Sequence, residues 1–178
     1  MFITSNLRWC TITYWEYNRP YHKQLHGLEK SVRISQNLLK NQNNSLCLQE
    51  IQKCTKNQEV LQTRSRIVDG TEIIVDQQRK IVLLSNLTNS MVYWTCPGLV
   101  NDLKRFKTNS IKPNETSIIY NYNMVQLNET IYRNMPGFHE PHIVNVSFSK
   151  NWGKTSNRNS IEQCPCWFNI SLNQFFFK

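Results

Sequence analysis

The spacing of apolar residues changes along the chain, and each spacing predicts a different kind of element. Residues 9–15 are rich in β-branched and aromatic types, which favours an extended strand that ends before Pro20. The next stretch carries apolar residues at spacings compatible with one helical face, namely Leu25, Leu28, Val32, Leu38 and Leu39. A second helix is expected to start near Ser45 and to continue to about Leu61.

From residue 67 onward the pattern changes to strands. Asp69-Gly70 stands between two β-branched runs, 67–68 and 71–75, and this arrangement predicts a β-hairpin. Further strands are expected at residues 79–84, 91–96, 117–122, 124–132 and 142–149. The sequence therefore predicts an α+β fold, with a strand plus helical segment over residues 1–66 and a β-rich segment over residues 67–178, joined as one unit.

Cysteine usage favours disulfide bonds. The six cysteines are scattered through the chain at Cys10, Cys47, Cys54, Cys96, Cys164 and Cys166. Structural zinc sites usually need close pairs with two to four intervening residues, whereas Cys164-Pro-Cys166 has one. We therefore expect three disulfides that staple the fold in an oxidising compartment, with a zinc site or reduced structural thiols as alternatives.

Six N-glycosylation motifs agree with an oxidising compartment, because glycosylation and disulfide formation both occur along the secretory route. Their acceptors are Asn43, Asn86, Asn114, Asn128, Asn145 and Asn169, and no motif contains proline at the middle position. The sequence therefore predicts a secreted or surface glycoprotein.

The charge of the chain indicates the kind of partner. The 178 residues include 21 basic and 12 acidic ones, a formal net charge of +9. Because no signature of a nucleic-acid-binding module accompanies the charge, a protein receptor or partner glycoprotein is expected, with acidic glycans as a further ligand. The start of the chain has no apolar run of signal-peptide length, and no run approaches the roughly 18 residues of a membrane span. Membrane association is therefore expected only through a partner or a missing segment.

Histidines provide the candidates for chemistry. His22 and His26 have the i,i+4 spacing of a helical metal site, whereas His139 and His142 flank Pro141 in a predicted loop. A metal-dependent hydrolase that uses these pairs is one alternative. However, the chain carries no recognisable nucleophile motif or glycine-rich phosphate loop, so we expect neither an enzyme nor a metal or cofactor.

Residues 80–96 resemble the two late strands of an immunoglobulin-like domain. The segment combines a hydrophobic strand, an Asn-Leu-Thr corner and an aromatic residue two positions before Cys96. It departs from that pattern because Trp94 replaces the corner tyrosine and no Asp-x-Gly is present. The resemblance implies a degenerate Ig-like β-sandwich as the alternative fold.

In overall style, the chain resembles glycoproteins of large DNA viruses, including the envelope glycoprotein Q type of roseoloviruses. The shared features are abundant lysine, asparagine and isoleucine, many sequons and an even number of cysteines. The resemblance implies a virion-surface protein that binds a host receptor or partner glycoprotein in entry or immune evasion. A secreted cytokine-like or glycan-binding factor is the alternative. Aromatic anchors dominate many interfaces, which makes Trp9, Trp15, Trp152 and Trp167 the candidate binding residues.

Overall fold

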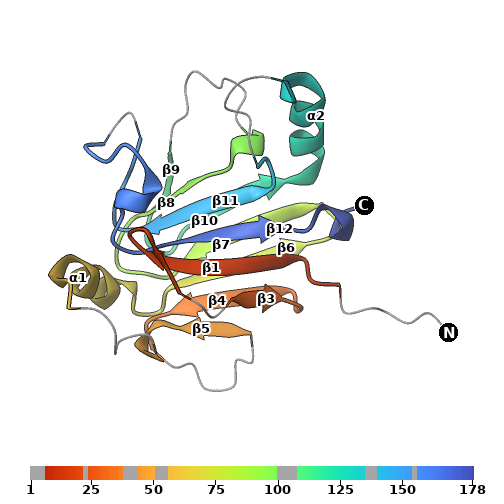
Figure 1. Cartoon of the computed structure of the whole chain (residues 1–178). Helices are drawn as coiled ribbons and strands as arrows, with labels where there is room; N and C mark the ends of the chain where they lie inside the picture. The colour runs from red at the N-terminus through yellow and green to blue at the C-terminus, as the bar shows by residue number, and fades with distance from the viewer. Residues whose placement is uncertain are drawn as a thin grey trace.

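Two β-sheets pack face to face, and one helix lies at each end of them (Figure 1). The computed structural model describes residues 7–21, 24–37, 44–50, 56–99, 108–134, 140–153 and 156–178. The larger sheet has the order β2-β1-β12-β11-β8-β9, with β3 also paired to β1, and the smaller sheet has the order β10-β7-β6-β4-β5. Segments on both sides of residue 66 therefore contribute strands to each sheet.

The elements have the following bounds. The larger sheet contains β1 (Cys10–Glu16), β2 (Arg19–Pro20), β3 (Leu25–Gly27), β8 (Val92–Thr95), β9 (Asn109–Ile111), β11 (Ile143–Phe148) and β12 (Trp167–Leu172). The smaller sheet contains β4 (Ser31–Ser35), β5 (Ser45–Cys47), β6 (Thr71–Asp76), β7 (Ile81–Asn86) and β10 (Thr116–Asn121). The helices are α1 (Gln58–Ile67) and α2 (Tyr122–Tyr132), with short 3-10 turns η2 (Pro97–Leu99), η4 (Ile161–Gln163) and η5 (Gln174–Phe176).

The helical N-terminal third was wrong, because the elements that the structure describes between residues 25 and 47 are the strands β3, β4 and β5. In β4, Val32 and Ile34 are fully buried while Arg33 between them is partly exposed, which is the two-residue period of a strand. β4 pairs antiparallel with β6 and parallel with β5. The apolar residues at positions 25–39 matched a helical spacing by coincidence, since pairing with β6 fixes the extended conformation.

Local sequence signals set both ends of α1. The side chain of Asn57 accepts hydrogen bonds from the backbone N–H groups of Glu59 and Val60, which caps the helix. After the helix, Gly70 adopts φ +75°, and a Cβ there would lie 1.6 Å from the Ile34 carbonyl oxygen. The predicted hairpin at Asp69-Gly70 was therefore wrong: this glycine makes the turn from α1 into β6.

α2 replaces the strand predicted at residues 124–132. The Asn121 side chain accepts from the Met124 N–H and caps the helix. Its inner face packs on η2, where the Asn128 amide donates to the Gly98 carbonyl at 2.8 Å. A Cβ at Gly98 would lie 2.3 Å from the Pro141 carbonyl oxygen and 2.8 Å from the Val125 side chain, so the packing of η2 against these neighbours requires glycine at this position.

The strands predicted at residues 79–84, 91–96 and 142–149 are confirmed as β7, β8 and β11. The core lies between the two sheets and includes aromatic pairs such as Phe148 and Phe168, whose ring centroids are 5.5 Å apart. Within the part of the chain that the structure describes, no helix combines the length and apolar character needed to cross a membrane.

The predicted disulfide staples were also wrong for the described cysteines. These five are buried free thiols: Cys10, Cys47, Cys96, Cys164 and Cys166. Burial raises the pKa of Cys10, Cys96 and Cys166 to about 12. They pack as small apolar side chains, which is the common role of a buried free cysteine. Cys54 lies outside the described residues.

Candidate protein-binding groove

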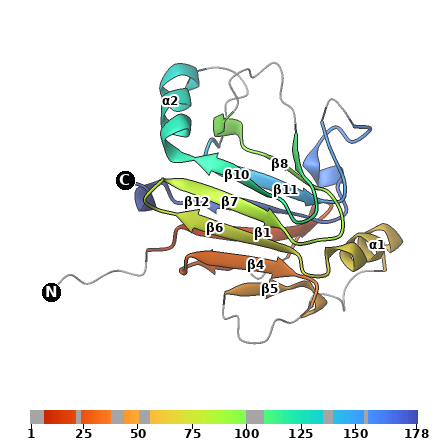
Figure 2. The ribbon, with the colours of Figure 1, turned by 180° about the vertical axis from the view of Figure 1, so that it is seen from behind.

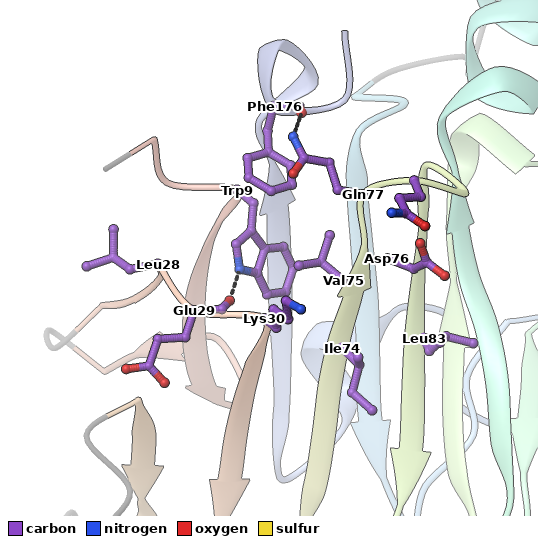
Figure 3. A pocket seen from close by; sticks show the side chains of 11 residues that line it. Trp9, Leu28, Glu29, Lys30, Ile74, Val75, Asp76, Gln77, Leu83 and Phe176 are labelled. Atoms are coloured by element: carbon purple, nitrogen blue, oxygen red, sulfur yellow. Dashed lines mark hydrogen bonds between the residues drawn. The ribbon is translucent and has the colours of Figure 1, made fainter. Parts of the chain in front are cut away.

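A groove of about 640 Å³ lies beside Trp9 at the end of the sandwich where η5 and the β6–β7 turn meet (Figure 3). This volume falls within the range of natural binding sites, roughly 300–1,000 Å³. Four separate parts of the chain line it: Trp9, Leu28, Glu29, Lys30, Ile74, Val75, Asp76, Gln77, Gln78, Leu83 and Phe176.

The floor of the groove is the indole of Trp9, which is fully buried. Its Nε1–H donates to the Glu29 carbonyl at 2.7 Å, and its backbone N–H donates to the Gly27 carbonyl at 2.9 Å. A Cβ at Gly27 would lie 2.6 Å from the indole, so only glycine lets β3 approach this closely. The Trp9 ring is therefore held in one position by its neighbours.

The walls are fixed by contacts between distant segments. The Val75 N–H donates to the Lys30 carbonyl at 2.9 Å, which joins the start of β4 to the end of β6. The Gln77 side-chain amide donates to the Phe176 carbonyl at 3.3 Å, which ties the β6–β7 turn to η5 (Figure 3). These bonds preform the groove, because they connect all of its walls without a ligand.

The groove continues onto the outer face of the smaller sheet. Ile74 pairs with Leu83, and Leu83 pairs with Ile118, so one apolar row crosses β6, β7 and β10. Ile118 is 42% exposed, and the other two side chains are partly exposed. No described helix covers this face (Figure 2). The apolar row therefore extends the contact surface available to a partner.

The lining chemistry suits binding. Glu29, Lys30 and Asp76 place both signs of charge around apolar walls. A mostly apolar cleft with a few polar groups is typical of a recognition site. Across the described residues, no group of three or more histidine, cysteine, aspartate or glutamate side chains could hold a metal ion.

Of the four predicted binding tryptophans, only Trp9 lines the groove, and its own indole is fully buried beneath it. Trp152 and Trp167 are buried, and Trp15 is half-buried and stacks on Trp167 at 5.0 Å between ring centroids. The Trp167 Nε1–H donates to the Tyr17 carbonyl at 2.7 Å. These three tryptophans belong to a second, smaller hydrophobic cluster that is separate from the main core.

The predicted glycosylation acceptors lie in different environments. Asn86 is fully buried, and its amide donates to the Ser90 and Ile111 carbonyls. Asn128 is also buried, with the bond to η2 described above. Asn114 is exposed, the pair Asn145 and Asn169 is partly exposed on neighbouring strands, and Asn43 lies outside the described residues.

The histidines do not converge where they are described. The His26 ring lies 3.3 Å from the Thr11 hydroxyl, whereas His142 lies 2.8 Å from the Tyr120 hydroxyl and 3.4 Å from a Glu129 carboxylate oxygen. Burial lowers the pKa of His142, although Glu129 opposes this shift. His22 and His139 lie outside the described residues.

Comparison with known proteins decides the family. The family model described as the MH2 domain matches residues 7–173. The chain belongs to the MH2 domain family. The match spans both sheets, both helices and every segment that lines the groove except η5.

Curated relatives agree with this family. The chain is 26% identical over 170 residues to "Mothers against decapentaplegic homolog 6" of Gallus gallus, covering 93% of this chain and 38% of the relative. It is 27% identical to "Mothers against decapentaplegic homolog 7" of Homo sapiens and 23% identical to "Dwarfin sma-3" of Caenorhabditis elegans, each over 172 residues and 93% of this chain. It spans 38% and 44% of these two relatives, so the chain covers less than half the length of each.

Solved structures support the same fold. The interferon regulatory factor 9 IAD domain superposes with a TM-score of 0.63 at 9% identity, covering 97% of this chain and 85% of that one. A structure of STAT2 in complex with IRF9 gives the same TM-score at 8% identity, covering 97% of this chain and 94% of that one. The degenerate Ig-like alternative was therefore wrong in its fold family, although an Ig-like domain is also built from two packed sheets.

The family overturns the predicted viral glycoprotein. MH2 domains belong to intracellular signal transducers, so the virion-surface role, the secretory location and the glycoprotein assignment were wrong. The secreted cytokine-like or glycan-binding factor and the metal-dependent hydrolase were wrong for the same reason. The number of sequons and the scattered cysteines led to the wrong compartment, because both features can arise from amino-acid composition alone as well as in proteins of the secretory pathway.

The expectation of a protein partner is confirmed in its general form, because MH2 domains act by binding other proteins. The family is also one of signal transducers rather than enzymes, in agreement with the expected binding role.

Proposed function

We propose that this MH2 domain acts in intracellular signalling of the TGF-β type by binding a protein partner, and that the groove over Trp9 holds part of that partner. The family match over residues 7–173 supports the assignment to intracellular signalling. The groove supports the proposed position of the binding site, because it is preformed, mostly apolar and continuous with an uncovered sheet face.

The partner belongs to the same signalling route. We infer either another signal transducer of the family or the intracellular part of a receptor, because the curated relatives are signal transducers. Acidic glycans and attachment to a membrane through a partner depended on the secretory interpretation and are not part of this proposal.

A TGF-β-responsive transcriptional reporter in cultured cells tests the proposal. Leu83→Arg places a charge on the apolar row beside the groove, and Leu83 is already partly exposed, so the fold should tolerate it. Ser171→Arg is the matched control, because Ser171 is an exposed strand residue of the other sheet.

We expect expression of the unchanged chain to alter the reporter output and Leu83→Arg to abolish that effect, with Ser171→Arg behaving like the unchanged chain. Purified MH2 domains of the named homologs and cytoplasmic domains of TGF-β-type receptors then form a binding panel for assigning the partner. A chain without effect on the reporter would contradict the signalling role. Equal effects of Leu83→Arg and the unchanged chain would contradict the position of the site.

A further inference from the structure

Three polar side chains meet where the two sheets join α2. Tyr120 lies near the end of β10 in the smaller sheet, His142 lies just before β11 in the larger sheet, and Glu129 lies in α2. The Tyr120 hydroxyl is 2.8 Å from Nδ1 of His142, and a Glu129 carboxylate oxygen is 3.4 Å from Nε2 of the same ring. One imidazole therefore links both sheets to the helix.

The neighbours of His142 determine where the neutral ring carries its proton. A carboxylate only accepts hydrogen bonds, so the nitrogen that faces Glu129, Nε2, is the protonated one. Nδ1 then has a free lone pair, and the Tyr120 hydroxyl donates to it. Burial lowers the pKa of His142, although Glu129 opposes this shift, so the neutral ring is the form present near pH 7.

We infer that a second proton on His142 loosens the attachment of α2 to the sheets, so that this cluster is an acid-sensitive latch. The inference does not depend on the proposed function. A protonated Nδ1 is itself a donor, and the hydrogen of the Tyr120 hydroxyl has to turn away from it. Tyr120 is fully buried, and its hydroxyl has no second acceptor among the described residues. This hydrogen is therefore left unpaired.

The gain on the other side of the ring is smaller. Protonation strengthens the attraction between His142 and Glu129, but the Glu129 side chain is 24% exposed and solvent screens the pair. A buried donor without an acceptor costs more than a partly exposed ion pair contributes. The charged ring thus favours an opening of the junction in which water reaches the Tyr120 hydroxyl.

The other contacts of this junction show how far the opening extends. The Asn128 amide donates to the Gly98 carbonyl, a contact without a titratable group, so the helix stays bound to η2. Phe177 packs on Tyr120 with ring centroids 5.5 Å apart. A change at Tyr120 therefore also reaches η5, which forms one wall of the groove.

His142 is the group through which acid acts on this cluster. Cys96 lies near Tyr120 and stays neutral, because burial raises its pKa to about 12. Burial also raises the pKa of Tyr120. Glu140 is exposed, and Lys80 lies 5.3 Å from an aromatic ring centroid at the start of α2. Histidine is the side chain whose charge ordinarily changes between pH 5 and 8.

An NMR titration of the imidazole protons in the whole chain tests the role of the hydroxyl. Tyr120→Phe keeps the ring that packs on Phe177 and removes the donor to Nδ1. Because this donor stabilises the neutral ring, we expect the pKa of His142 to rise in Tyr120→Phe and to fall in Glu129→Gln. Tyr93→Phe removes a hydroxyl beside the second hydrophobic cluster and should leave it unchanged. A pKa of His142 that falls or stays the same in Tyr120→Phe would overturn the inference.

Amide hydrogen exchange at pH 7.5 and 5.5, corrected for intrinsic rates, tests the loosening of the helix. In the unchanged chain we expect exchange in α2 to be about fivefold faster at the lower pH, the effect of about one lost hydrogen bond. Tyr120→Phe and His142→Gln should each remove this difference, and circular dichroism confirms that both are folded. Exchange in α2 that does not depend on pH in the unchanged chain, or that keeps its dependence in Tyr120→Phe, would overturn the latch.

Discussion

Trp9 and Trp94 form a matched pair for measuring what holds the groove floor. Both indoles belong to the main core and are at least nine-tenths buried. The Trp9 Nε1–H has a 2.7 Å bond to the Glu29 carbonyl, whereas the Trp94 Nε1–H has no acceptor among the described residues. Replacing each by phenylalanine removes the same atoms, so the cavity costs largely cancel in the difference between the two variants.

The expected difference follows from the hydrogen bonds. Trp9→Phe loses a bond that contributes about 1 kcal/mol, while Trp94→Phe removes an unsatisfied donor whose burial costs about 1–3 kcal/mol. Trp9→Phe should therefore lower the free energy of unfolding by about 2–4 kcal/mol more than Trp94→Phe.

Urea unfolding at 25 °C, followed by far-ultraviolet circular dichroism, measures this difference directly. In thermal unfolding the same difference corresponds to about 4–16 °C in Tm for a domain of this size. Equal losses in the two variants, or a larger loss for Trp94→Phe, would refute the assignment of Trp9 as the hydrogen-bonded anchor of the floor.

Three further predictions test other parts of the fold. Gly70→Ala should lower the free energy of unfolding in urea by about 3 kcal/mol or more, because the new Cβ would overlap a β4 carbonyl. Gly153→Ala, at φ +84° with no atom within 4 Å, should lower it by only about 1 kcal/mol. Equal losses in the two variants would contradict this prediction. Burial lowers the pKa of His142, so the unfolded chain binds more protons than the folded one and stability should fall as pH drops below about 6.5. His142→Gln should make stability less dependent on pH in this range. An unchanged pH dependence would contradict this role of His142. Glu59 accepts from the Tyr17 hydroxyl, which lowers its pKa, so its contribution is present above about pH 4.3 and lost as pH falls through the lowered value. Glu59→Gln should speed amide exchange around Arg158, with little global destabilisation because the pair is partly exposed; unchanged exchange would exclude this anchoring role.

Strands with local signals could be predicted from the sequence. β7 and β8 are dense in β-branched and aromatic residues, and both were located correctly. β4 was missed because five residues, Ser31–Ser35, carry too few periods to separate a strand from a helix. The alternation of Val32 and Ile34 around Arg33 was the available signal, and the pairing with β6 and β5 decides the outcome.

α2 shows the opposite error. Its isoleucine, threonine and tyrosine residues favour a strand by propensity. The cap at Asn121 and the three- and four-residue spacings of Met124, Leu127 and Ile131 were helical signals that this propensity concealed. Packing of Asn128 on Gly98 then stabilises the helix, and no local pattern reveals that contact.

The groove could not be predicted, because it is assembled from parts that are distant in sequence. Trp9 meets Val75 and Phe176 only after the two sheets pack. One clue was present: in the continuous apolar run Ile81-Val82-Leu83-Leu84, a strand must turn some side chain outward, and Leu83 is that residue. The cysteines gave no such clue, since spacing alone does not separate a core thiol from a disulfide.

The most direct test of the proposed binding groove is amide hydrogen exchange of the chain, alone and with the panel protein that binds it. We expect the partner to slow exchange at residues 28–30, 74–83 and 174–176, which surround Trp9. Protection confined to α1 and residues 156–163, at the opposite end of the sandwich, would contradict the groove as the docking site.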